Sequence, residues 1–328
     1  MRLTLVVLFL ATLLAIPVVV LADAVFDRES QSETAAYRVG TPFVWPEHPR
    51  AADPGTALRV LGEAATATGT NVLRTTVSAP GSGPERIRTY VLMGRPRTAL
   101  FDGFTLAEGR WLSAAESRGG TATVSSARRG ERDNVGVPAV FGHRYELTFA
   151  PLRQAFDALP TAGRYVVESP DAADTGRFLA VVHQRLVEAG VEDLALADLT
   201  PANVPAPVET GGYLEVLAYV LAGLATLVIA FLLLREGKRI GVLLLSGFPA
   251  TRIWYEVVGR LQLGAFAAGL GLCTIVSLTV PGVDPLLLRS LAVTLGQVTV
   301  AGFAATAVVG LLIIHRVRIS DLIKGSLQ

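Results

Sequence analysis

Four long apolar stretches constrain the fold of this chain more than any other feature. Each is about 20 residues or slightly longer, and a helix of that length spans the roughly 30 Å hydrocarbon core of a bilayer. They are residues 3–22, 214–234, 261–280 and 291–314, and Glu215 is the only charged residue within them. Because lipid offers no hydrogen-bond partner to an exposed backbone, each stretch is expected to be helical. The sequence therefore predicts four transmembrane helices.

The composition agrees with membrane insertion and excludes some classes of function. Of 328 residues, 51% are apolar and 17% are charged, which is too apolar for an ordinary soluble protein. The net charge of +1 provides no overall basic field for nucleic acid. The single cysteine, Cys273, lies in a membrane stretch, so no disulfide is expected outside the membrane.

The positions of the basic residues predict the orientation. They precede the first stretch, fill the link at 235–260 and follow the fourth stretch at 315–324, whereas the link at 281–290 is neutral. With four crossings, all basic segments fall on one side, and by the positive-inside rule both termini are cytoplasmic. The predominance of Arg over Lys, with Ala, Gly and Val abundant, suggests a GC-rich bacterial genome. The expected location is a bacterial cytoplasmic (inner) membrane, as a multi-pass protein.

The first stretch has an alternative interpretation as a signal peptide. Val20-Leu21-Ala22 before Asp23 resembles a signal-peptidase site, and cleavage would leave three membrane helices. However, the stretch exceeds the usual apolar core of about 7–15 residues. Only Arg2 precedes it, so an uncleaved helix over residues 1–23 is favoured.

Residues 24–212 are expected to form an extracytoplasmic α+β domain. Amphipathic helical patterns cover 55–67 and 174–189, and strand-like patterns cover 71–77, 87–92 and 164–168. A further strand is predicted at 191–199, giving a β-α-β lobe. The predicted fold class is thus a membrane all-α fold (four transmembrane helices) with an inserted α+β extracytoplasmic domain between helix 1 and helix 2.

The remaining residues, 213–328, are expected to form a three-helix membrane domain. Its predicted parts are transmembrane helices at 214–234, 257–280 and 291–314, a cytoplasmic coupling segment at 235–256 and a cytoplasmic tail at 315–328. Proline- and glycine-containing residues at 201–212 form the predicted linker from the outer domain.

Motifs for catalysis are absent from the sequence. No stretch matches the G-x-x-x-x-G-K-[ST] phosphate loop, the G-x-S-x-G elbow or the H-E-x-x-H zinc motif. The four histidines are far apart in sequence. We therefore expect no enzyme activity, and no catalytic, cofactor-binding or metal-binding residue, in this chain.

Small residues at four-residue spacing line the membrane stretches. Such stripes allow helix backbones to approach closely, either within one subunit or between two subunits. Both possibilities remain open from the sequence. The candidate helix-packing residues are Ala222, Thr226, Gly264, Gly302, Thr306 and Gly310.

The link after the second stretch contains the most informative pattern. Apolar residues at 240 and 242–245 lie between two basic clusters, which is unusual for a solvated loop. A short helix there would be bounded by Gly237 and by the break at Gly247-Phe248-Pro249. It could lie among membrane lipid headgroups or dock on a cytoplasmic partner. The candidate residues are Arg235, Lys238, Arg239, Ile240, Gly241, Leu243, Leu244 and Gly247, of which Ile240, Leu243, Leu244 and Gly247 can share one face.

This link resembles the signature of the FtsX-like and MacB-type ABC transporter permeases, among which the bacteriocin-associated permease-like proteins look most similar. In that signature a basic stretch leads into E-I-G, and a second glycine follows after five intervening residues. Ile240-Gly241 and Gly247 fall at matching positions, and residues 317–325 are similar to the family's C-terminal tail. Two departures are Arg239 in place of the acidic residue and Pro249 in the turn after Gly247.

The resemblance implies a permease subunit that works as a homodimer or heterodimer with a separate cytoplasmic ABC ATPase, which would bind ATP and Mg. ATP hydrolysis there would move the outer domain and drive export or extraction of a substrate. One alternative is an FtsX-type regulator that transmits motion to an extracytoplasmic protein partner. Another is a membrane-anchored binding or sensor protein without an ATPase.

Overall fold

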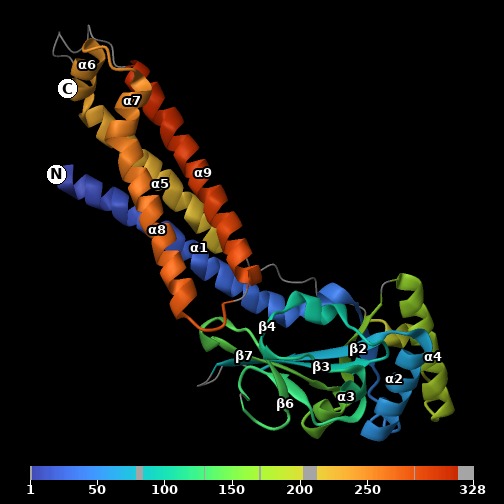
Figure 1. Cartoon of the computed structure of the whole chain (residues 1–328). Coiled ribbons are helices and arrows are strands. Elements are labelled where there is room, and N and C mark those ends of the chain that lie inside the picture. Colours follow the sequence, from blue (N-terminus) through green and yellow to red (C-terminus); the bar gives the residue numbers. More distant parts are fainter. Residues whose placement is uncertain are drawn as a thin grey trace. The chain divides into compact units, whose positions relative to one another are not determined.

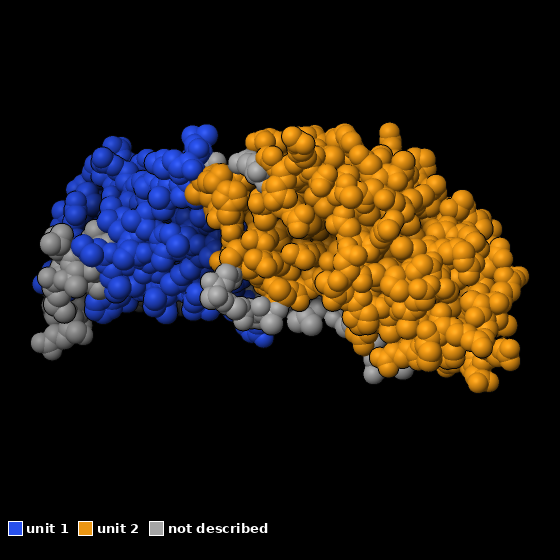
Figure 2. Space-filling view, turned by 90° about the horizontal axis from the view of Figure 1, so that it is seen from below, with its two compact units in different colours: residues 1–27, 210–279, 286–328 blue, residues 28–209, 280–285 orange. Residues whose placement is uncertain are grey.

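The computed structural model describes residues 2–78, 84–128, 130–169, 171–201, 213–283 and 285–316. The chain forms two compact units (Figure 2). The helix unit comprises residues 1–27, 210–279 and 286–328, and the sheet unit comprises residues 28–209 and 280–285. Most of the predicted linker, 202–212, and the tail segment 317–325 that resembles the permease family lie outside the described residues.

Long apolar helices build the helix unit (Figure 1). They are the first part of α1 (Arg2–Val39), α5 (Tyr213–Arg235), α8 (Arg260–Thr279) and α9 (Pro285–Arg316). Between α5 and α8 lie α6 (Gly237–Leu245), α7 (Ala250–Trp254) and the π-helical turn η5 (Tyr255–Gly259). Val7–Val39, Tyr213–Arg235, Ala250–Val276 and Pro285–His315 are long and apolar enough to cross a membrane. The expectation of four helices of this kind is confirmed, and they mark the chain as a membrane protein.

The helix unit has apolar side chains on its outside as well as inside. Leu233 and Trp254 belong to one internal cluster, and Ile16 and Leu295 belong to another. In contrast, many large apolar side chains on the outer surface of the unit are exposed, and Val300, for example, is 70% exposed. Soluble proteins rarely expose apolar area on this scale, whereas a lipid-facing surface requires it.

Helix α1 is longer than its apolar stretch. Residues 23–39 are mostly polar, yet they contain no glycine or proline and are rich in helix-forming Ala, Glu and Arg. The helix therefore continues to Val39 and ends before Gly40. A Cβ on Gly40 would lie 2.4 Å from the carbonyl oxygen of Val167, so only glycine fits this close approach.

Within the described residues of the sheet unit, eight strands form one mixed sheet. The strands are β1 (Thr41–Trp45), β2 (Asn71–Val77), β3 (Glu85–Met93), β4 (Leu106–Gly109), β5 (Thr123–Ser125), β6 (Asn134–Pro138), β7 (Tyr145–Pro151) and β8 (Gly163–Glu168). Their order is β1-β8-β2-β3-β7-β5-β6-β4. The neighbours β3 and β7, and β5 and β6, are parallel, and the other pairs are antiparallel.

Both faces of the central strands are buried because successive side chains point to opposite sides of a sheet. Val72 packs in the cluster beneath α2 (Pro54–Thr68) and α4 (Ala172–Glu188), whereas the next residue, Leu73, packs in a second cluster with Phe101 and Phe149. Figure 1 shows α2 and α4 side by side. The helical and strand patterns predicted at 55–67, 71–77, 87–92, 164–168 and 174–189 all have counterparts here.

The other short elements complete the sheet unit. They are the helix α3 (Ala114–Gly119) and the 3₁₀ turns η1 (Ala99–Gly103), η2 (Phe141–His143), η3 (Leu152–Asp157) and η4 (Leu196–Leu199). The strand predicted at 191–199 is wrong, because the segment contains η4 and no strand. Val191 and Leu199 are instead buried individually against the cluster that contains α2 and α4, so their apolar character reflects packing of a loop.

The predicted fold class, a membrane all-α fold with an inserted α+β domain between helix 1 and helix 2, is wrong. The eight-stranded mixed sheet is a main part of the architecture, not a small addition to a helical fold. The sheet unit is also not a clean insertion, because it includes the end of α1 and residues 280–285 from the link between α8 and α9. In that link, Pro281 O accepts a hydrogen bond of 2.9 Å from the backbone N–H of Gly142. Hydropathy locates membrane helices but does not show which polar segments join a sheet.

Candidate functional site

The strongest candidate site is the segment around α6, between α5 and α7. One face of α6 is buried: Ile240 is 0% exposed and packs in the cluster that contains Leu233 and Trp254. On the opposite face, Val242 and Leu245 are 62% and 64% exposed. One side of α6 therefore packs against the rest of the helix unit, and the other side exposes two large apolar side chains.

The predicted coupling residues divide between these two faces. Four of them, Arg235, Lys238, Arg239 and Gly247, are exposed, and Gly241 is buried. Leu243 and Leu244 are half-buried against the same cluster as Ile240, so these three residues share the inward face. Sequence reasoning missed the outward pair. The i, i+3 spacing of Val242 and Leu245 could have revealed this pair, because that spacing places both residues on one side of a helix.

A glycine-dependent turn ends α6. Gly247 has φ +81, a left-handed conformation that favours glycine. The backbone N–H of Gly247 donates to Leu244 O at 3.0 Å, and that of Phe248 donates to Leu243 O at 3.2 Å. This pair of bonds is the Schellman motif, and the following proline prevents the helix from continuing. Pro249 is the N-cap residue of α7, so the turn leads directly from the end of α6 into the next helix.

Exposed basic residues lie on α6 and on the neighbouring α7. Arg239 lies 3.9 Å from Glu236, and Arg252 lies 3.9 Å from Glu256. The Arg252 guanidinium also lies over the ring of Phe248, 5.0 Å from its centroid. Both contacts are long, and the guanidinium groups of Arg239 and Arg252 are themselves exposed, so much of the basic character of this surface is available for an acidic partner or for lipid phosphate.

Trp254 connects α7 to α9, and two predicted packing residues contact it. Its indole Nε1 donates to the backbone oxygen of Thr306 at 3.2 Å, and its ring packs edge-on against Phe303 with centroids 5.1 Å apart. A Cβ on Gly310 would lie 2.5 Å from Trp254 Cδ1. Glycine at 310 is therefore the residue that allows the indole to lie against α9.

The other predicted packing residues are distributed unevenly. A Cβ on Gly302 would lie 3.6 Å from the Cβ of Ala222, which is ordinary contact between α9 and α5. Thr226 is buried, and its hydroxyl donates to Ala222 O at 2.9 Å. Gly264 is exposed on α8, and no atom would lie within 4 Å of a Cβ there. Four of the six residues thus lie at contacts between helices of the unit, Thr226 is buried with its hydroxyl bonded within α5, and Gly264 is exposed.

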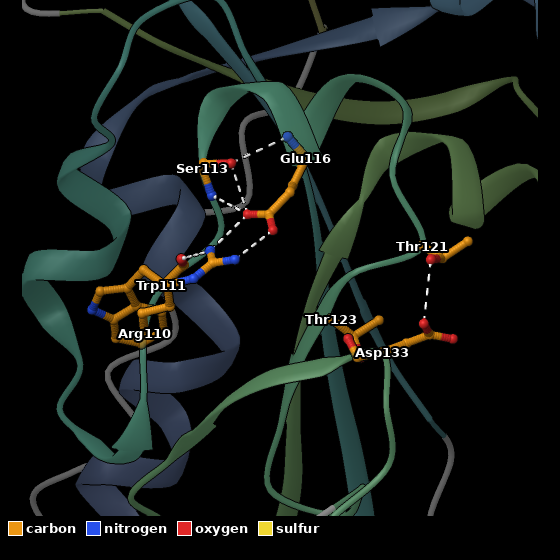
Figure 3. A network of polar contacts seen from close by, with 7 residues as sticks. All are labelled: Arg110, Trp111, Ser113, Glu116, Thr121, Thr123 and Asp133. Carbon is orange, nitrogen blue, oxygen red and sulfur yellow. Dashed lines mark hydrogen bonds and ion pairs between the residues drawn. The ribbon is translucent and has the colours of Figure 1, made fainter.

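A polar network in the sheet unit holds the start of α3 (Figure 3). The Ser113 hydroxyl accepts from the Glu116 backbone N–H, and the Glu116 carboxylate accepts from the Ser113 N–H and from both terminal nitrogens of Arg110. The hydrogen bonds from Arg110 and from the Ser113 backbone lower the pKa of Glu116 to about 2. Next to this network, the Trp111 ring stacks on Phe101 with centroids 4.5 Å apart. The arrangement is a capping box, and its role is structural.

Neither a known protein family nor a characterised protein matches this sequence. Within the described residues, no three His, Cys, Asp or Glu side chains converge on a position for a metal ion.

Proposed function

We propose that this chain is the transmembrane subunit of an ABC-type transporter in a bacterial inner membrane. In this proposal both termini are cytoplasmic, and α6 docks on a separate ATPase that binds ATP and Mg. The observation that carries the proposal is the exposed apolar pair Val242 and Leu245 on a short helix beside Lys238 and Arg239. An amphipathic helix of this kind suits a hydrophobic groove on a partner.

The way in which α6 is held supports a role in transmitting force. A flexible loop would absorb a push from a partner, whereas α6 is fixed by Ile240 on its inner face and by the Schellman turn at Gly247. Trp254, in the same cluster as Ile240, is bonded to α9. Displacement of α6 would therefore reach the membrane helices through packed side chains. As the family resemblance implies, we expect two permease subunits in each transporter.

One observation favours an FtsX-type regulator as the second candidate function. Helix α1 is continuous from Arg2 to Val39, and it contributes residues to both the helix unit and the sheet unit. In this candidate function, movement of the membrane helices is transmitted along the chain to the sheet unit without transport of a substrate. This candidate predicts that the sheet unit binds an extracytoplasmic protein.

Co-purification in mild detergent with ABC ATPases from the same genome tests the proposal. The expected result is a stoichiometric complex that is lost in Leu245→Asp and weakened by charge reversal in Lys238→Glu/Arg239→Glu. Leu245 is 64% exposed, so Leu245→Asp should leave the protein folded. Leu196→Asp is the matched control, because Leu196 is an exposed leucine in the sheet unit. Absence of any ATPase from the folded protein, or equal binding by all variants, would refute the docking role.

A further inference from the structure

A cavity and a groove lie next to each other in the helix unit. The cavity, of about 40 Å³, is bordered by residues of α1, α5, α8 and α9. The groove, of about 340 Å³, runs along α8 and α9. Gln262, Phe266 and Thr299 line both. Leu263 and Val300, which also line the groove, are 44% and 70% exposed, so the groove opens on the outer, lipid-facing surface.

Gln262 carries a buried amide that this fold does not fully satisfy. Its side chain is only 6% exposed, and its carbonyl oxygen lies 2.9 Å from the hydroxyl of Thr306. That hydroxyl has a single hydrogen and lies equally close to Phe303 O, at 2.9 Å. The hydroxyl can donate to only one of these two oxygens. A glutamine amide has two N–H donors as well as its carbonyl acceptor, so part of the hydrogen-bonding capacity of Gln262 remains unused. In the described part of the chain, no acceptor for Gln262 Nε2 is found.

Thr299 adds a second polar group at the same place. A threonine in a helix commonly bonds its hydroxyl to the carbonyl four residues earlier, as Thr226 and Thr274 do. Thr299 is half-buried, and its hydroxyl has no such bond within the residues that the structure describes. A polar group without a partner is unfavourable inside a membrane, where no water replaces the missing bond. Gln262 and Thr299 line the same cavity, and a few polar groups in an otherwise apolar lining are the pattern of a binding site.

We propose that this site binds an acyl ester or a similar lipophilic molecule with a neutral carbonyl or hydroxyl group. The ligand would enter from the bilayer between α8 and α9, with its chain along Phe266 and Phe303 and its polar group at Gln262 and Thr299. No charged side chain lines the cavity or the groove among the described residues, so a charged group would find no counter-ion there. The groove volume lies at the lower end of the range of about 300–1,000 Å³ for small-molecule sites.

Quenching of Trp254 fluorescence by a monoacylglycerol with a brominated chain tests this site. The reporter is suitable because the Trp254 ring lies 5.1 Å from the ring of Phe303, which lines the groove. The full chain in detergent micelles is titrated with the probe, and Trp254→Phe supplies the background from the other two tryptophans. We expect quenching that saturates at a low mole fraction of probe. Gln262→Leu and Thr299→Val should each raise the half-saturating mole fraction about three- to tenfold, the effect of losing one hydrogen bond.

Three comparisons separate the site from general partitioning. Thr274→Val, which removes an exposed threonine on α8 whose hydroxyl is already bonded, should leave the titration unchanged. A brominated alkane without an ester should quench without saturation. Ala304→Phe, which fills the groove without changing the polar pair, should abolish saturation even if Gln262→Leu does not fold. Linear quenching that is equal in all variants, or equal for the alkane, would overturn the proposal. The test does not depend on whether an ATPase binds.

Discussion

At the scale of single residues, two glycines from the same kind of stripe have different surroundings. Both Gly310 and Gly264 lie in apolar membrane helices at small-residue spacing. Gly310 faces the indole of Trp254, whereas Gly264 faces open space. The spacing of small residues shows where helices can approach, but the partner that needs the space is visible only in the fold.

This difference predicts opposite effects of one substitution. Gly310→Ala should reduce the free energy of unfolding by about 1–3 kcal/mol, because a Cβ 2.5 Å from Trp254 overpacks the interior. Gly264→Ala should be neutral or stabilising by up to about 1 kcal/mol, since alanine is the better helix former. Thermal unfolding in detergent, followed by tryptophan fluorescence, compares the two variants. Equal loss of stability in both would contradict the assigned packing.

Glu116 predicts a pH dependence of the sheet unit. Its pKa is lowered from 4.5 to about 2 by the hydrogen bonds from Arg110 and Ser113, so the folded state favours the ionised form. The resulting stabilisation is fully present above the unfolded pKa of 4.5 and is lost as the pH falls toward 2. Glu116→Gln should remove this part of the pH dependence.

Denaturation curves at several pH values, for the wild type and Glu116→Gln, measure the effect. Glu131→Gln is a suitable control because Glu131 is 59% exposed and lies 3.8 Å from Arg128, a weak surface pair. The difference in stability between the wild type and Glu116→Gln should shrink between pH 4.5 and about 2, whereas the control should follow the wild type. A constant difference across this range would show that the network of Figure 3 does not hold the carboxylate in its ionised form.

At the scale of elements, the link after α8 depends on backbone conformation. Gly282 has φ +79, and a Cβ there would lie 1.9 Å from Val140 O. The clash involves backbone and cannot be relieved by a side-chain rotation. Glycine at 282 is therefore required for residues 280–285 to pack within the sheet unit.

We expect Gly282→Ala to detach this link. The left-handed conformation alone costs about 1–2 kcal/mol for alanine, and the clash adds to it. Hydrogen exchange at the Gly142 amide is the direct measurement, because this group donates to Pro281 O at 2.9 Å. Exchange at Gly142 should accelerate in Gly282→Ala and not in Gly271→Ala, where a Cβ meets nothing within 4 Å. Unchanged protection in Gly282→Ala would contradict the packing of the link.

At the scale of the whole molecule, the proposed orientation places α6 and the sheet unit on opposite sides of the membrane. Because the chain has a single cysteine, Cys273→Ser provides a background without thiols. In that background, Glu192→Cys in the sheet unit should react with a membrane-impermeant maleimide in intact cells. Arg239→Cys in α6 should react only after permeabilisation. Both positions are exposed, so labelling reports the side of the membrane. The reverse result would invert the topology and remove α6 from the reach of a cytoplasmic ATPase.

The membrane helices and several elements of the sheet unit could be predicted from local sequence. Runs such as 214–234 are long and nearly free of charge, and hydrophobicity of this strength is a local property that needs no knowledge of the fold. The same holds for the capping box at Ser113 and for the strand at 71–77, where neighbouring residues carry the whole signal. The failed strand at 191–199 had an apolar pattern too, but there it reflected burial of a loop.

How these elements combine could not be predicted from local sequence and follows from the folded structure. The order of the eight strands, the inclusion of α1 and of residues 280–285 in the sheet unit, and the outward side of α6 all depend on contacts between distant residues. Ile240 and Val242 are both apolar and lie two residues apart, yet one is buried and the other exposed. In the sequence, Gln262 is likewise a single polar residue in an apolar run. Only the fold shows that it lines the same cavity as Thr299. Such roles are set by what packs against a residue, and local sequence does not contain that information.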